Sequence, residues 1–264
     1  MATTTKAPAG AAKVQVIRSD ERYHADHGWL DTRWHFSFGD YYDEQNMNWG
    51  PLRVFNDDTL VPGAVWPMHP HRDIEGITYV AEGMFEHADS RGNGGILPPG
   101  SVQRATLGYG MEHSEGNASA TEPMRFIQMW IIPSERGLEP TIEQRSFDDP
   151  SRRGRWLPVL VPAEGYGGAD SPSNPEAVTV HQDAAVYASL LDPGQRLSHR
   201  FRPDFQGYLF VVHGAAHLVT DSGTDVGELG EGGAAKVVGE PGFAAQSGDE
   251  GSELLLVETR TIDR

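Results

Sequence analysis

The sequence of 264 residues contains no cysteine. This absence excludes disulfide bonds, thiolate zinc sites, iron–sulfur clusters and thiol redox chemistry. A metal ion bound by this chain must therefore be held by imidazole and carboxylate groups, and 11 histidines are available.

Basic residues are also scarce, with 21 Lys and Arg against 38 Asp and Glu and a formal net charge of −17. Proteins that bind nucleic acid directly use clustered Lys and Arg to neutralise phosphates. We therefore expect no direct binding to nucleic acid. A role in gene regulation would have to pass through a protein partner.

Long apolar runs are missing, since no stretch approaches the roughly 20 residues of a membrane-spanning helix. Residues 1–13 are rich in Ala and Thr and have no apolar run, which predicts a disordered tail and not a signal peptide. We expect a cytoplasmic protein that does not bind membranes and acts as a monomer.

Sustained helical periodicity is lacking, whereas short β-branched and aromatic runs are frequent and are bounded by Gly, Pro and Asp. The runs are residues 34–38, 52–55, 76–80, 84–88, 126–132, 156–161, 186–191, 208–212, 216–220 and 254–258. Short strands without long helices between them are typical of all-β sandwiches and barrels. We predict no helix longer than about fifteen residues.

The two halves of the chain share a weak internal similarity. Residues 78–84 read TYVAEGM and residues 209–215 read LFVVHGA, an apolar strand followed by a polar residue and a glycine. The length suits two domains of about 130 residues each. We therefore predict two antiparallel jelly-roll barrels packed face to face, one formed by residues 1–140 and one by residues 141–264.

Two pairs of side chains carry the candidate chemistry. His69 and His71 are separated by one residue, as are His113 and Glu115. On a strand, residues i and i+2 point to the same face, so each pair can converge on one ion. Three nitrogens and one carboxylate suit a divalent ion such as Fe(II), Mn, Ni, Co, Cu or Zn and leave positions open for catalysis.

A single His-x-His pair occurs by chance and is more often a surface feature than a metal site. The second pair, His113 and Glu115, favours the metal interpretation. Ordinary hydrogen-bonded or surface roles are expected for His24, His27, His35, His87, His181, His213 and His217. The second half offers His199 without a matching His-x-Glu, so we expect the C-terminal barrel to bind no metal.

Several longer motifs resemble one protein family. They are SFGDYYDE at residues 37–44, LRVFNDD at 52–58, HPHRDIEGITYVAEG at 69–83, EHADSRGNGG at 86–95 and HSEGNASATEP at 113–123. The sequence resembles the pirin family of two-cupin proteins at these motifs. The general cupin pattern also fits Gly63, His69, His71 and Glu75.

The resemblance implies a fold of two cupin barrels with one metal ion, commonly iron, in the first barrel. It implies the ligands His69, His71, His113 and Glu115, whereas Glu75 is not a ligand. Pirin-like proteins include bacterial quercetin 2,3-dioxygenases and others that act as transcriptional or metabolic co-regulators.

Two functions follow as hypotheses. The first is a metal-dependent dioxygenase that cleaves a flavonol such as quercetin and releases carbon monoxide, with Glu115 as the catalytic base. Glu115 as a ligand without a role in proton transfer is the alternative for that residue. The second function is a non-enzymatic, metal-responsive protein that binds a transcription factor or a metabolic enzyme.

Overall fold

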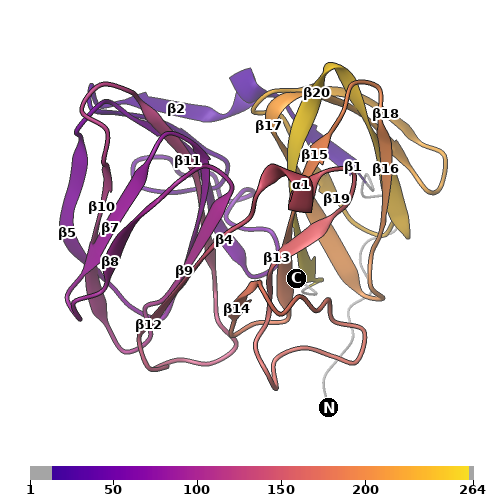
Figure 1. The fold of residues 1–264 in the computed structure, drawn as a ribbon. Helices are drawn as coiled ribbons and strands as arrows, with labels where there is room; N and C mark the ends of the chain where they lie inside the picture. The colour runs from indigo at the N-terminus through magenta and orange to yellow at the C-terminus, as the bar shows by residue number, and fades with distance from the viewer. Residues whose placement is uncertain (1–13, 262–264) are drawn as a thin grey trace.

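The computed structural model describes residues 14–261, so the tail expected at residues 1–13 lies outside the described part. Figure 1 shows two β-barrels side by side, the N-terminal one in indigo and magenta and the C-terminal one in orange and yellow. The described helices are the 3₁₀ turn Ser19–Glu21 and α1, Asp149–Arg152. Neither is long and apolar enough to cross a membrane. The predicted all-β fold is confirmed.

The N-terminal barrel consists of a large sheet and a small sheet. The large sheet has the order β12-β9-β6-β11-β4-β3-β2 and the small one the order β5-β10-β7-β8. The strands of the large sheet are β2 Tyr23–Asp26, β3 Leu30–Trp34, β4 Leu52–Leu60, β6 Glu75–Glu82, β9 Ser101–Thr106, β11 Met124–Ile131 and β12 Thr141–Ser146. Those of the small sheet are β5 Val65–His71, β7 Phe85–Asp89, β8 Gly94–Leu97 and β10 Met111–Asn117.

The C-terminal barrel is built around two long strands, β17 and β20, which pair with each other along most of their length. The path through its sheet is β1-β19-β17-β20-β15-β13-β14, with β16 on β20 and β18 on β17. Its strands are β1 Val14–Ile17, β13 Leu157–Pro162, β14 Val178–Val180, β15 Ala184–Leu191, β16 Arg196–Arg200, β17 Phe205–Thr220, β18 Asp225–Gly230, β19 Ala234–Val237 and β20 Gly242–Arg260.

Two strands lie on the other side of the boundary expected after residue 140. β1 pairs with β19 and so belongs to the C-terminal barrel, as Figure 1 shows. β12 pairs with β9 in the N-terminal barrel. Each barrel therefore contains one strand from the other half of the sequence, which is hydrogen-bonded into its sheet.

Two of the expected strand limits are wrong. The run at residues 34–38 is a strand only at its first residue, because β3 ends at Trp34 and the chain then turns through Gly39, whose φ is 52°. The runs at 208–212 and 216–220 form one strand, β17, which bends at Gly214. A side chain at Gly214 would collide with the carbonyl oxygen of Gly251, and its φ of 75° also favours glycine.

The central strands of the large N-terminal sheet, β4, β6 and β11, are buried on both faces. Along β6, Ile77 and Tyr79 pack in the core between the barrels, whereas Val80 packs inside the N-terminal barrel. β11 alternates in the same way, with Ile127 toward the C-terminal barrel and Phe126 inward. Because side chains alternate between the two faces of a strand, consecutive residues pack in different cores, one between the barrels and one inside the N-terminal barrel.

The core between the barrels is continuous and aromatic-rich. The N-terminal barrel contributes Phe36, Phe55, Ile77, Tyr79, Ile127 and Met129, and the C-terminal barrel contributes Val159, Val178, Val186, Tyr208, Phe210 and Leu255. Burying one such side chain stabilises a fold by about 1.5–3 kcal/mol. The two barrels therefore form one body.

A buried histidine joins the two barrels within this core. The Arg22 guanidinium, which can only donate, lies 2.8 Å from His35 Nε2. His35 is therefore neutral, and its Nδ1–H donates to the hydroxyl of Tyr208 in the C-terminal barrel. Burial, with the charges of Arg22 and Lys236, holds the pKa of His35 well below its ordinary value.

We expect this histidine to make the fold sensitive to acid. In the unfolded chain His35 binds a proton below about pH 6.5, whereas in the fold it stays neutral, so stability is lost as the pH falls. The loss from one such group approaches about 1.4 kcal/mol per pH unit. Denaturant unfolding at pH 7 and pH 5 should show a shallower loss in His35→Gln than in wild type. An identical pH dependence in both proteins would contradict this role.

Candidate metal centre

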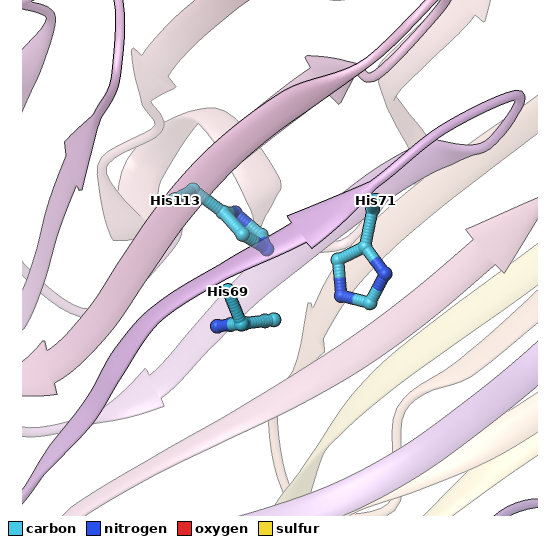
Figure 2. A group of neighbouring side chains, drawn as sticks. All are labelled: His69, His71 and His113. Carbon is cyan, nitrogen blue, oxygen red and sulfur yellow. The ribbon is translucent and has the colours of Figure 1, made fainter.

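The three candidate histidines come from two paired strands. β5 carries His69 and His71, β10 carries His113, and the register places His113 opposite His69. Paired residues of an antiparallel sheet share a face, so the three imidazoles meet inside the barrel. Figure 2 shows the three rings gathered around a common space. Their nitrogens lie within 4.8 Å of one another.

Strand β5 positions its two histidines in spite of two prolines. It is an edge strand of the small sheet, where proline is tolerated because one side of the strand forms no ladder. The carbonyl oxygen of Pro67 accepts a hydrogen bond of 2.8 Å from His69 Nδ1. His69 Nδ1 therefore holds the proton, and the lone pair of Nε2 is available to a metal.

The other two imidazoles are held neutral by their surroundings. Burial, followed by the charge of His69, lowers the pKa of His71 to about 4. Burial, followed by the neighbouring histidines, lowers the pKa of His113 to about 3. Neutral imidazole is the form that binds metal. Both ring nitrogens of His113 are buried and have no hydrogen-bond partner among the described residues.

Glu115 is buried as His113 is, but its carboxyl group stands apart from the three histidines. The register of β10 against β5 shifts between His113 and Glu115, so Glu115 pairs with Trp66. Gln128 donates a hydrogen bond of 2.9 Å to Oε1 of Glu115, and Thr78 in turn donates to Gln128. The carboxylate is thus not among the groups that meet within 4.8 Å, although it lines the same cavity as His69 and His71.

Burial raises the pKa of Glu115 to about 7, against the opposing effect of its hydrogen bonds. At neutral pH this carboxyl group therefore exists in both protonation states. A group with such a pKa can accept and return a proton under physiological conditions.

The cavity in front of these residues is small, about 70 Å³. Its inner wall is polar and comes from the large sheet, through Asn56, Asp58 and Gln128. Its rim is aromatic, formed by Phe38, Trp66 and Trp130. A second, wider pocket of about 590 Å³ lies next to it and shares His71 as a wall.

The residues present fit one metal ion. Three imidazoles converge, and His113 has a buried nitrogen that needs a partner. Imidazole with carboxylate nearby is a donor set for divalent transition metals. Among the described residues no other group of three His, Asp or Glu side chains meets this closely.

Other histidines are engaged elsewhere. His181, from the C-terminal half, lies 2.6 Å from the fully buried Glu75, so the Glu of the cupin pattern bonds across the barrel interface. In the C-terminal barrel His199 Nε2 lies 2.8 Å from Glu258. His87 is different, because it is buried and both its ring nitrogens lack a partner among the described residues.

The polar inner wall was missed at the sequence level. Asn56 and Asp58 belong to the LRVFNDD motif, where alternation along β4 places both on the inner face. Thr32 donates to Asp58, and burial raises the pKa of Asp58 to about 8. The available signal was the spacing of Asn56 and Asp58 at i and i+2, which puts both side chains on one face of a strand.

Comparison with known proteins places this geometry in a family. A family model described as pirin matches residues 16–131, and one described as the quercetinase C-terminal cupin domain matches residues 170–259. A quercetin 2,3-dioxygenase of Escherichia coli strain K12 is 41% identical over 202 residues, which are 76% of this chain and 82% of the relative. The chain belongs to the pirin family.

Solved structures of pirins agree with the fold. The bacterial pirin YhhW from Escherichia coli, in complex with nickel(II), aligns with a TM-score of 0.82 at 33% identity and covers 94% of this chain and 100% of that one. A pirin-like protein of Caulobacter vibrioides is 38% identical over 194 residues, 74% of this chain and 80% of the relative. The pirin family model spans all four expected ligands.

We expect His71→Ala to abolish tight metal binding in this pirin without unfolding it. The imidazole is one of three that converge, whereas its partly exposed position adds little to the core. Elemental analysis after gel filtration should find about one metal ion per chain in wild type and almost none in the variant. His217→Ala, which removes an exposed imidazole beside Asp225, is the control and should keep its metal. Full occupancy in His71→Ala would contradict the site.

Proposed function

We propose that this pirin is a metal-dependent dioxygenase that cleaves a flavonol such as quercetin. The ion is held by His69, His71 and His113, with Glu115 as the fourth ligand. Both atoms of dioxygen enter the product, and one ring carbon of the flavonol leaves as carbon monoxide. The observation that carries the proposal is the convergence of three imidazoles on one space, with the buried carboxyl group of Glu115 lining the same cavity.

The bound ion supplies Lewis-acid chemistry and orients the reacting groups. The protein supplies the base. Gln128 holds one oxygen of Glu115, and no hydrogen bond from a described residue reaches the other, so that second oxygen is available to the ion and to a substrate hydroxyl beside it. Proton acceptance by Glu115 turns the bound flavonol into an electron-rich anion, which is the form that reacts with dioxygen.

The metal itself is expected to be Fe(II). Three imidazoles and one carboxylate also suit Ni, Mn, Co, Cu and Zn, so the donor set alone leaves these open. The nickel(II) in the YhhW complex is the metal bound by that protein and does not identify the metal of this chain. The cytoplasmic location expected from the sequence stays a prediction.

The size of the cavity defines how a flavonol must bind. About 70 Å³ holds little more than two water molecules, each of which occupies about 30 Å³ in the liquid. Pockets that bury drug-sized ligands measure about 300–1,000 Å³. We therefore place the rings in the adjoining pocket of about 590 Å³, between Pro70, Arg72 and Met111, with the reacting oxygens directed past His71.

The direct test is anaerobic incubation of metal-loaded protein with quercetin, followed by oxygen. Loss of the flavonol absorbance together with release of carbon monoxide is the expected result. Fe(II), Ni, Mn, Co and Cu are tried in turn, with the His71→Ala protein as the control without metal. No consumption of quercetin with any metal would rule out this substrate.

We expect Glu115→Gln to lower kcat by about 10² to 10⁴-fold, the usual contribution of a general base. The amide keeps an oxygen for Gln128 but accepts no proton. Metal content and rate are measured on the same sample, so that loss of metal is separated from loss of the base. Near wild-type turnover at full metal occupancy would leave Glu115 as a ligand only.

The small inner cavity favours a second candidate function. A metal cavity too small for a whole flavonol also suits a non-enzymatic, metal-responsive binding protein, with a transcription factor or metabolic enzyme as its partner. Such a protein would bind its partner with different affinity in the metal-loaded and metal-free states. This function becomes the better one if metal-loaded wild type never consumes a flavonol.

A further inference from the structure

One buried polar side chain close to the metal centre has no role in the proposed reaction. His87 lies on β7, and 2% of its surface is exposed. Neither of its ring nitrogens has a hydrogen-bond partner among the described residues. Burying a hydrogen-bond donor and an acceptor without partners lowers the stability of the fold. A histidine at this position therefore suggests a role other than stabilising the fold.

The register places His87 on the same face as the metal ligands. β7 pairs with β10, with His87 opposite Glu115 and Asp89 opposite His113. The rings of His87 and His113 have their centroids 5.9 Å apart, in an edge-to-face arrangement. His87 thus stands behind His113, in the next strand of the small sheet.

His113, the neighbouring ligand, lacks a hydrogen-bond acceptor for its ring N–H. A metal-bound histidine uses one ring nitrogen for the ion and donates the N–H of the other to an acceptor, which sets the orientation of the ring. For His69 that acceptor is the carbonyl oxygen of Pro67, at 2.8 Å. For His113 no acceptor is recorded among the described residues.

The charged neighbour of His113 is already engaged. Oδ1 of Asp89 accepts from the backbone amides of Arg91 and Asn93, at 2.8 and 2.9 Å, and Oδ2 accepts from the side chain of Asn93 at 2.8 Å. Asp89 is therefore used to shape its own turn. His87 offers a ring nitrogen that can accept.

We propose that His87 is a positioning residue of the metal centre. It accepts the N–H of His113 through one water molecule and so decides which nitrogen of His113 faces the ion. The inference rests on the proposed metal site and is independent of the reaction catalysed there.

The test compares His87→Phe with His87→Gln in two measurements on the full chain. The first is the dissociation constant for Ni(II) and Co(II), obtained by competition with a chelator. The second is the unfolding midpoint of the metal-free protein. Phe fills the space without an acceptor, whereas Gln keeps one. His217→Gln, an exposed site in the other barrel, is the matched control.

We expect His87→Phe to bind metal about 10- to 100-fold more weakly, the usual cost of losing such a partner. The same variant should unfold no earlier than wild type without metal, because two buried ring nitrogens without partners are removed. His87→Gln should recover most of the affinity. The absorption spectrum of the Co(II) form should shift in Phe and return toward wild type in Gln.

A purely structural role for His87 predicts the opposite pattern, with lower metal-free stability and unchanged affinity in the folded fraction. Wild-type affinity in a folded His87→Phe protein would overturn the inference and leave the metal site intact. His87→Leu, which is smaller, takes the place of Phe if that variant does not fold. Absence of metal binding in wild type itself would overturn both the site and the inference.

Discussion

The metal centre depends on a sheet that is buried on both faces. In β4 and β11, alternate residues pack against the C-terminal barrel, and the residues between them line the metal cavity. Ile127 and Met129 are fixed in the core between the barrels, so Gln128 between them has one orientation, toward Glu115. The C-terminal barrel supplies none of the expected ligands. It covers one face of the large sheet, while burial in the interior of the first barrel raises the pKa of Asp58 and of Glu115.

The local part of this arrangement could be predicted from the sequence. A period of two puts His69 with His71, and His113 with Glu115, on single faces, and the structure brings the three histidines together. The position of Glu115 could not be predicted, because it depends on the register shift in β10 against β5. Such a shift arises from how two strands fit together, and neither strand alone carries a signal for it.

The long-range part was predicted less well, for the same physical reason. β1 pairs in the C-terminal barrel and β12 in the N-terminal barrel. The sequence of a short strand does not indicate which sheet it joins. The histidines show the same limit. His35 bonds to a hydroxyl 173 positions away and His181 to a carboxylate 106 positions away, so both differ from surface histidines only through contacts that folding creates. His87 looked ordinary because a lack of partners is a property of a site and not of a residue type.

One side chain, His71, is important for both candidate functions, the enzyme and the binding protein. His71 is a candidate ligand and also the wall between the inner cavity and the outer pocket. Its ring packs edge-on against Trp130, with centroids 4.7 Å apart, and Trp130 belongs to the rim of the inner cavity. A substrate in the outer pocket would therefore meet the ligand His71 before it reached Glu115. In a binding protein, an ion that fixes the ring of His71 would also fix the wall of the outer pocket. A partner that touches this wall would then distinguish the metal-loaded from the metal-free protein.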